Sequence, residues 1–322
     1  MSSYLQNLTV RLATGLGNLP EETRELHAGY FLRAQKEDGG FGGRMGGSDL
    51  YYTSFALRGL SILGQLYGPV AEKAADFLRG QMAGHQTIVD FFSLFYAANL
   101  LKVSAGIDIF QDSDPEWRDN VAEFLHTLRR EDGGYAKAPE GHAGSTYHTF
   151  LVVLVLELLE KETPDAKSVV EFLESRRDPE GGWREIRASK RAGTNPSAAA
   201  VATLNILREH EPDLPQMDHD TKELTLDFLC EMQTDEGGLR ANTRIPIADL
   251  LSSFTGGLTL LDLESFDELD VSLLRKFVNS LQLPEGGFQA AAWDDAHDVE
   301  YSFYGLGCLA LLNLGKGDQA NG

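Results

Sequence analysis

The stretch Gln-Lys-Glu-Asp-Gly-Gly-Phe at 35–41, followed by Ser-Asp-Leu-Tyr-Tyr-Thr at 48–53, decides the fold because both halves recur along the chain. Recurrence at a fixed period is the mark of a repeat architecture. An aromatic–aliphatic pair returns at intervals of about 46 to 56 residues, at Phe31-Leu32, Phe77-Leu78, Phe124-Leu125, Phe172-Leu173, Phe228-Leu229 and Phe277-Val278. A Gly-Gly pair follows all but the second, at Gly39-Gly40, Gly133-Gly134, Gly181-Gly182, Gly237-Gly238 and Gly286-Gly287.

Two kinds of helix alternate around these glycines. Before each Gly-Gly the apolar residues fall on one helical face, as at Val121, Phe124 and Leu128, and the glycines can end the helix in a left-handed cap. After a polar loop comes a segment apolar on nearly every face, which must be buried all round. These second helices are predicted at 53–63, 94–101, 149–159, 197–207, 253–261 and 302–312.

An amphipathic outer helix, a turn and an apolar inner helix cannot bury their surface alone, so each pair needs neighbours. We therefore expect one all-α domain over 1–322, an α/α toroid with six helix pairs. The predicted pairs span roughly 27–65, 71–105, 118–161, 165–209, 220–265 and 268–314. A long polar residue four positions before the first glycine, as at Gln35, Arg129 and Gln233, is expected to hydrogen-bond backbone at the neighbouring turn.

Composition restricts the possible partners. A net charge of -21 argues against a nucleic-acid partner, because backbone phosphates attract Lys and Arg. Cys230 and Cys308 are the only cysteines, which favours reduced thiols and a cytoplasmic protein. The start lacks a basic segment followed by an apolar one, and no uninterrupted apolar run approaches the roughly 18 residues of a membrane span.

The repeat resembles that of the prenyltransferase and squalene-cyclase families, and most closely the beta subunit of protein prenyltransferases of the Rab geranylgeranyl transferase type. The resemblance covers roughly 27–313, and its most specific segments are 39–53, 140–147 and 237–249. It implies an α/α toroid around an apolar cavity that takes farnesyl or geranylgeranyl diphosphate. It also implies an alpha-type partner subunit and a protein acceptor.

The family's transferases hold a zinc ion with an Asp-x-Cys pair and a His, and leave one position open for the acceptor thiolate. Asp249 matches the aspartate, but Leu251 stands at the cysteine position and Tyr301 at the histidine position. One carboxylate does not hold zinc. We therefore expect Asp249 to be a remnant of a zinc site and the usual zinc geometry to be missing. The sequence does not assign a cofactor.

An acidic loop offers magnesium as an alternative metal. Asp294, Asp295 and Asp298 lie beside Trp293, and oxygen-rich groups suit magnesium better than zinc. In a chain this acidic, a solvated loop explains the same residues.

Basic residues at the entrances of the inner helices are candidates for diphosphate binding. They are His142, which resembles the family's diphosphate-binding histidine segment one repeat early, together with Lys190, Arg191, Arg240 and Arg244. Helix N-termini pointing at the same end would add to the attraction for an anion. Surface arginines that pair with Asp and Glu are the competing interpretation.

Aromatic residues in the first turns of the inner helices are candidates for the isoprenoid wall. Tyr51, Tyr52, Phe92, His148 and Tyr301 stand at these positions, and Trp293 in the loop before the last inner helix is a further candidate. An apolar chain with π bonds gains about 25 cal/mol per square ångström on leaving water. The alternative is that these aromatics plug the ring.

The leading hypothesis is a prenyltransferase-like protein that binds an isoprenoid diphosphate and can transfer the prenyl group without the usual zinc triad. The first alternative is a non-catalytic interaction scaffold with the same fold. It is favoured because Leu251 and Tyr301 stand where the family's transferases have zinc ligands. The second is a terpene cyclase, although the chain lacks the Asp-x-Asp-Asp signature of acid-initiated cyclisation.

Overall fold

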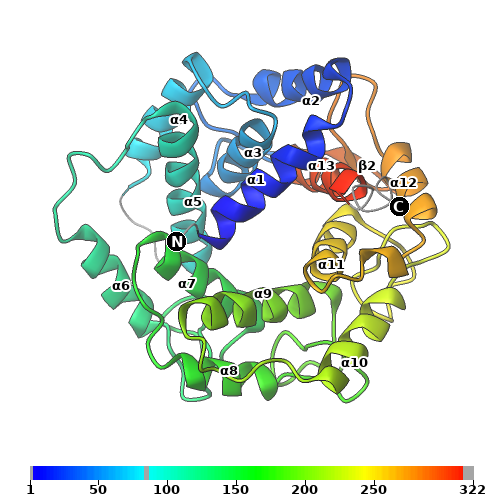
Figure 1. Ribbon diagram of the computed structural model, residues 1–322. Helices are drawn as coiled ribbons and strands as arrows, with labels where there is room; N and C mark the ends of the chain where they lie inside the picture. Colours follow the sequence, from blue (N-terminus) through cyan, green and yellow to red (C-terminus); the bar gives the residue numbers. More distant parts are fainter. Residues whose placement is uncertain (1–2, 83–86, 315–322) are drawn as a thin grey trace. The chain divides into compact units, whose positions relative to one another are not determined.

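The computed structural model describes residues 3–82 and 87–314, and within them the chain forms thirteen α-helices, one short 3-10 helix and a two-stranded sheet (Figure 1). The described residues pack as two compact units. Unit 1 contains 3–82, 93–113 and 271–314, and unit 2 contains 87–92 and 114–270. A single domain over 1–322 stays a prediction.

All six predicted helix pairs are present. The outer helices are α2 (Glu21–Ala34), α4 (Pro69–Gly80), α6 (Trp117–Thr127), α8 (Ala166–Glu174), α10 (His219–Cys230) and α12 (Val271–Ser280). The inner helices are α3 (Leu50–Ile62), α5 (Ile88–Ala105), α7 (Thr146–Leu158), α9 (Thr194–His210), α11 (Leu250–Asp262) and α13 (Val299–Leu314). The inner helices carry more buried apolar side chains than the outer helices, as their sequence pattern predicted.

The inner helices begin earlier than predicted. Polar residues just before the apolar runs cap the first turns: Asp49 accepts the amide N–H of Tyr52 at 2.8 Å, and Ser145 accepts that of His148 at 3.2 Å. A capping side chain satisfies an N–H that has no partner within the helix. The polar cap residue therefore marks the start of the helix, which lies three or more residues before the predicted one.

The Gly-Gly turns form as expected. The first glycine of each pair has a positive φ, from 85° at Gly39 to 100° at Gly181. A Cβ on Gly39 would lie 2.1 Å from the carbonyl oxygen of Lys73, so no other residue fits there.

Hydrogen bonds hold each turn to its neighbours. Gln35 donates to the carbonyls of Gly39 and Val70, both at 2.9 Å, which confirms the predicted role of the long polar residue. A hydroxyl of the inner helix also accepts the N–H of the residue after the glycines. These pairs are Phe41 with Thr53, Tyr135 with Thr149, Trp183 with Ser197, Leu239 with Ser253 and Phe288 with Ser302.

Four elements were not predicted from the sequence. Helix α1 (Tyr4–Gly17) begins with a capping box formed by Ser3 and Gln6, and it packs on α13 and α3 within unit 1 (Figure 1). Strands β1 (Gln289–Ala291) and β2 (Asp294–His297) pair antiparallel before α13, and a 3-10 turn (Phe266–Glu268) precedes α12.

Helix α5 is long and apolar enough to cross a membrane, with 18 residues and a mean hydropathy of 1.4. More than half of it is buried inside the protein. Since a buried core helix meets the same criteria, this one helix is weak support for a membrane span.

His27 links α2 to the last Gly-Gly turn inside unit 1. Its Nδ1 accepts the N–H of Gly287 at 3.1 Å, its Nε2 lies 3.3 Å from Oε1 of Gln282, and its ring stacks on Phe288. Burial lowers the pKa of His27 below 6.5. The neutral imidazole, which alone can accept at Nδ1, is therefore the native form.

This depressed pKa predicts an acid-sensitive stability. The contribution of His27 is fully present above pH 6.5 and is lost as the pH falls below 6.5 toward the folded-state pKa. The loss approaches about 1.4 kcal/mol per pH unit. Urea unfolding at pH 7.5 and pH 5.0 should show a steeper loss for the wild type than for His27→Gln, while the exposed control His126→Gln should follow the wild type. Equal pH slopes for all three proteins would contradict this role.

Candidate functional site

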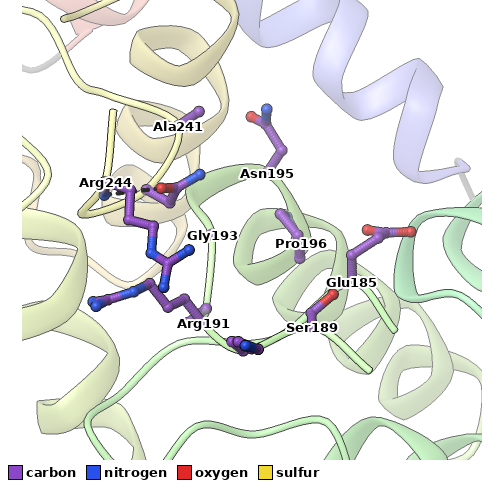
Figure 2. Close-up of a pocket in the computed structure, with 11 residues that line it drawn as sticks. Glu185, Ser189, Arg191, Gly193, Asn195, Pro196, Ala241 and Arg244 are labelled. Carbon is purple, nitrogen blue, oxygen red and sulfur yellow. Dashed lines mark hydrogen bonds between the residues drawn. The ribbon is translucent and has the colours of Figure 1, made fainter. Parts of the chain in front are cut away.

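A pocket of about 400 Å³ opens in unit 2 where two loops meet the start of α9 (Figure 2). The first loop runs from 185 to 193 and the second from 241 to 244. The lining residues include Glu185, Ser189, Lys190, Arg191, Asn195, Asn242 and Arg244. The pocket therefore brings together three basic residues, two amides and one carboxyl.

The three basic side chains are the dominant electrostatic feature of this pocket. Lys190, Arg191 and Arg244 are exposed, and within the described residues none of them forms an ion pair. Nη1 of Arg191 donates to the hydroxyl of Thr243 at 2.9 Å, which joins the two loops. Figure 2 shows the side chains of Arg191 and Arg244 next to each other. Two adjacent guanidinium groups repel each other, and a bound anion relieves that repulsion.

The N-terminus of α9 also faces this region. Its cap residue is Gly193, which provides no side-chain acceptor, whereas α7 and α11 are capped by Ser145 and Asp249. The N–H of Thr194 donates to the carbonyl of Ala241 at 2.9 Å. The helix dipole thus adds partial positive charge beside the basic side chains.

Glu185 is the one carboxyl of the pocket lining, and it lies across Gly193 and Pro196 from the two arginines (Figure 2). Its Oε1 accepts hydrogen bonds from the hydroxyl of Ser145 and from the N–H of Tyr147, the latter at 3.3 Å. Burial raises the pKa of Glu185, and these two hydrogen bonds partly oppose the shift.

Three of the predicted phosphate-binding residues therefore share one pocket, and the others lie outside its lining. His142 is exposed, and Nη2 of Arg240 donates to the carbonyl of Glu231 at 3.2 Å. Burial, with a smaller effect of Lys137, lowers the pKa of His148 to about 4. His148 is therefore neutral at pH 7 and offers no positive charge to a diphosphate.

Sequence reasoning missed Glu185 and Asn195 as pocket residues. Glu185 is one acidic residue among many in this chain, and Asn195 falls in the unpredicted first turn of α9. No sequence signal separated either from ordinary loop residues.

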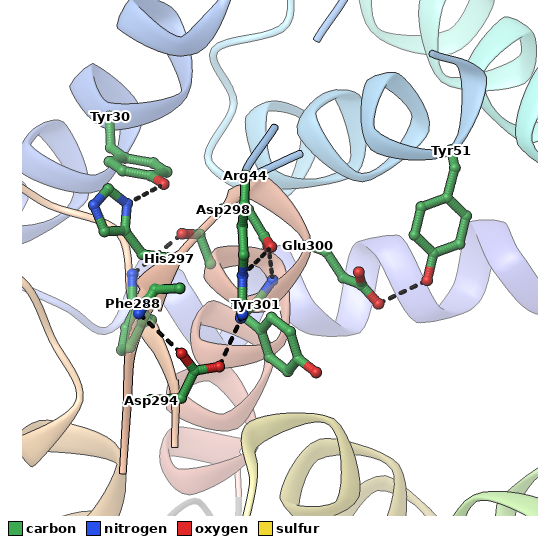
Figure 3. Close-up of polar contacts among 11 residues, drawn as sticks. Tyr30, Arg44, Tyr51, Phe288, Asp294, His297, Asp298, Glu300 and Tyr301 are labelled. Atoms are coloured by element: carbon green, nitrogen blue, oxygen red, sulfur yellow. Dashed lines mark hydrogen bonds and ion pairs between the residues drawn. The ribbon is translucent and has the colours of Figure 1, made fainter. Parts of the chain in front are cut away.

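A second polar cluster lies in unit 1, around Arg44 (Figure 3). The guanidinium donates to Asp294 at 2.9 Å and to Asp298 at 3.3 Å, and it lies 5.6 Å from the ring centre of Tyr301. Asp298 also caps α13 by accepting the N–H of Tyr301 at 3.0 Å. Nearby, the hydroxyl of Tyr30 lies 2.9 Å from Nδ1 of His297. These contacts anchor the β1–β2 hairpin.

The predicted aromatic wall is assembled in part within unit 1. The hydroxyl of Tyr51 donates to Glu300 at 2.7 Å, and its ring packs against Tyr52 and Phe55 at 5.3 and 5.0 Å between centroids. Burial raises the pKa of Glu300. The buried guanidinium of Arg58 lies 4.3 Å from the ring centre of Phe55. This aromatic cluster thus already contains a cation of the protein itself.

Two other aromatic candidates have different surroundings. Phe92 is buried in α5, which fits either a wall or a core residue. Trp293 is 64% exposed at the turn between β1 and β2, so its indole is open to solvent.

The residues at the family's zinc positions do not fit zinc. Asp249 caps α11: its Oδ1 accepts the N–H of Ser252 at 2.7 Å and its Oδ2 accepts the hydroxyl of Ser252 at 3.0 Å. Burial raises the pKa of Asp249. Leu251 offers no ligand atom, and the phenol ring of Tyr301 is a neighbour of Arg44.

The acidic loop does not assemble a metal site either. Arg44 forms ion pairs with Asp294 and Asp298, and the side chain of Asp295 is exposed to solvent. Across residues 3–82 and 87–314, no group of three or more His, Cys, Asp or Glu side chains is arranged to hold a metal ion. The guanidinium of Arg44 already offsets part of the negative charge that magnesium would neutralise.

Comparisons with known proteins agree on the family. The model of the prenyltransferase alpha-alpha toroid domain matches residues 20–81, 86–241 and 200–321. The chain therefore belongs to the prenyltransferase α/α toroid family, and its fold is an all-α toroid of six helix pairs. No curated protein matches the sequence.

Solved structures with this fold have diverse activities. Candida albicans protein geranylgeranyltransferase-I complexed with GGPP matches with a TM-score of 0.70 at 17% identity, over 91% of this chain and 92% of that one. A variant of the type II terpene cyclase MstE from Scytonema, in complex with geranylgeranyl dihydroxybenzoate, matches with a TM-score of 0.62 at 12% identity, over 96% and 99%. An alpha-1,6-mannanase from a Salegentibacter species matches with a TM-score of 0.62 at 12% identity, over 91% and 98%. At these identities the likeness shows the fold alone.

Proposed function

We propose that this protein binds an isoprenoid diphosphate and that the unit 2 pocket holds the diphosphate group. The observation that carries the proposal is the meeting of Lys190, Arg191 and Arg244, none of which has an ion-pair partner in the described residues, in one pocket at the start of α9. The isoprenoid part of the proposed ligand is inferred from the family to which the chain belongs and from the resemblance of its sequence.

The charges of pocket and ligand match. An isoprenoid diphosphate carries two to three negative charges near neutral pH, and the three basic side chains bring three positive ones. Guanidinium groups bind phosphate oxygens in pairs of parallel hydrogen bonds, so Arg191 and Arg244 suit this ligand better than lysines would. Because the three side chains are exposed, each contributes only modestly to the binding free energy of the diphosphate. The affinity therefore depends on all three acting together.

We further propose that any transfer of the prenyl group proceeds without the family's zinc triad. Support comes from Asp249, whose two carboxylate oxygens accept hydrogen bonds from Ser252 in the first turn of α11. It also comes from Leu251, whose side chain has no atom that could bind zinc. Transfer itself, its acceptor and a cytoplasmic location are all part of the proposal.

A non-catalytic scaffold is the second candidate, because Leu251 and Tyr301 replace both remaining zinc ligands. A terpene cyclase is less consistent with unit 1. There, the guanidinium of Arg58 lies within 4.3 Å of the Phe55 ring centre and 4.7 Å of that of Tyr96. A permanent cation in an aromatic cluster disfavours a carbocation beside it.

Thermal unfolding tests the proposed function. Geranylgeranyl diphosphate at 100 times its Kd should stabilise the protein by about 2.7 kcal/mol and raise Tm by several degrees, with or without added zinc or magnesium. Geranylgeraniol, which lacks the diphosphate, should give a much smaller shift. If geranylgeranyl and farnesyl diphosphate leave Tm unchanged in every metal condition, the protein is not an isoprenoid-diphosphate binder.

Asp249→Ala separates a capping role from a metal-binding role. Loss of the cap should reduce the free energy of unfolding by about 1 kcal/mol. Elemental analysis should find zinc far below one ion per chain in both the wild type and the variant. Stoichiometric zinc in the wild type that disappears in the variant would show that Asp249 is a metal ligand.

A further inference from the structure

We propose that Glu185 is a proton-carrying binding residue of the unit 2 pocket, so that the pocket takes up a phosphoanion and a proton together. The proposal rests on the proposed function, because it concerns the same pocket. It adds a property that the three basic residues alone would not have, namely an affinity that increases as the pH falls.

The position of the carboxyl is the first support. Glu185 lines the pocket, yet its Oε1 is held at the first turn of α7 by the hydroxyl of Ser145 and the N–H of Tyr147. No described residue donates a hydrogen bond to its Oε2. Protonation at Oε2 therefore breaks no contact, and it creates an O–H donor that a phosphate oxygen can accept.

Electrostatics supplies the coupling. A bound phosphoanion near Glu185 disfavours the ionised carboxylate, in the same direction as the burial that already raises its pKa. The anion therefore draws a proton onto Glu185, and by linkage the protonated pocket binds the anion more tightly. Affinity should fall as the pH rises above the pKa of Glu185 in the free protein.

The other charged groups around Glu185 set the limits of this effect. Lys190, Arg191 and Arg244 share the pocket but are not among the causes of the shift in the pKa of Glu185, and the neutral His148 on α7 adds no charge at pH 7. The positive charge of Lys137 helps to lower the pKa of the His148 imidazole. Of the described residues that line the pocket, Glu185 is the one acidic group, so the proton uptake should belong to it.

Isothermal titration calorimetry with inorganic pyrophosphate and with geranylgeranyl diphosphate tests the proposal. Titrations at pH 6.0 and pH 8.0, each in two buffers of different ionisation enthalpy, give the affinity and the number of protons taken up. The comparison is between the wild type and Glu185→Gln, whose amide oxygen can still accept from Ser145 and Tyr147. The protonation of the ligand itself cancels in this comparison because it is common to both proteins.

At pH 8.0, Glu185→Gln should bind both ligands about tenfold more tightly than the wild type, and this gain should shrink at pH 6.0. The wild type should take up more protons than the variant. Glu180→Gln removes an exposed carboxylate of the same unit outside the pocket and should behave as the wild type. Equal affinities and equal proton uptake in wild type and Glu185→Gln would overturn this inference alone. Failure of the wild type to bind either ligand would overturn the proposed function as well.

Discussion

Replacing both Arg191 and Arg244 by glutamate should lower the affinity for geranylgeranyl diphosphate by about 100-fold or more. The double change turns a pocket with three basic groups and one carboxyl into one with a single lysine and three carboxyls. A phosphoanion then loses two paired guanidinium contacts and meets two like charges. Calorimetric titration at low salt measures the effect, and the difference should shrink as the salt concentration rises.

A matched control separates the pocket from the net charge of the protein. Arg187→Glu combined with Lys167→Glu makes the same change in charge at exposed positions of unit 2 outside the pocket lining. This control should lose less than about threefold in affinity, because exposed charges outside the pocket lining are screened by solvent and salt. Comparable losses in both double variants would mean that the ligand binds elsewhere.

Asp132→Ala should reduce the free energy of unfolding by about 3 to 5 kcal/mol, because it leaves the buried guanidinium of Arg176 without its ion pair. Asp132 accepts from Nη2 of Arg176 at 2.7 Å and from the amides of Gly134 and Gly144, both at 3.2 Å. The Arg176 side chain is 3% exposed, so its guanidinium depends on this carboxylate for charge compensation. Urea unfolding at pH 7 provides the measurement.

Two further variants test this explanation. Asp76→Ala removes the exposed partner of Arg79 and should cost less than about 1 kcal/mol. Adding Arg176→Met to Asp132→Ala should recover part of the lost stability, because the unpaired buried charge is gone. A loss below about 1 kcal/mol for Asp132→Ala, or a double variant less stable than the single one, would contradict the buried ion pair.

The fold was predictable because its signals are local and repeated. Each Gly-Gly turn requires a left-handed glycine, and each inner helix is apolar on all sides, so the residues themselves indicate both elements. The hydroxyl groups that accept backbone N–H groups of the Gly-Gly turns, such as those of Thr53 and Ser197, also stand at the start of the predicted apolar runs. Helix α1 lies outside the repeat, and no internal copy could indicate it.

The candidate site was predictable only in part. Scarcity of basic residues made Lys190, Arg191 and Arg244 stand out, and they do share a pocket. The charge state of His148 was not predictable, since it depends on burial and on Lys137, which a residue pattern does not show. The pairing of Arg44 with Asp294 joins residues 250 positions apart, and only the packing of unit 1 brings them together.

The most direct test of the central claim is the position of a bound ligand. A crystal structure of the protein with a non-hydrolysable geranylgeranyl thiodiphosphate would locate the two phosphorus atoms. We expect phosphate oxygens within hydrogen-bonding distance of the guanidinium groups of Arg191 and Arg244 at the start of α9. A diphosphate group bound elsewhere in the molecule, with this pocket filled by solvent, would contradict it.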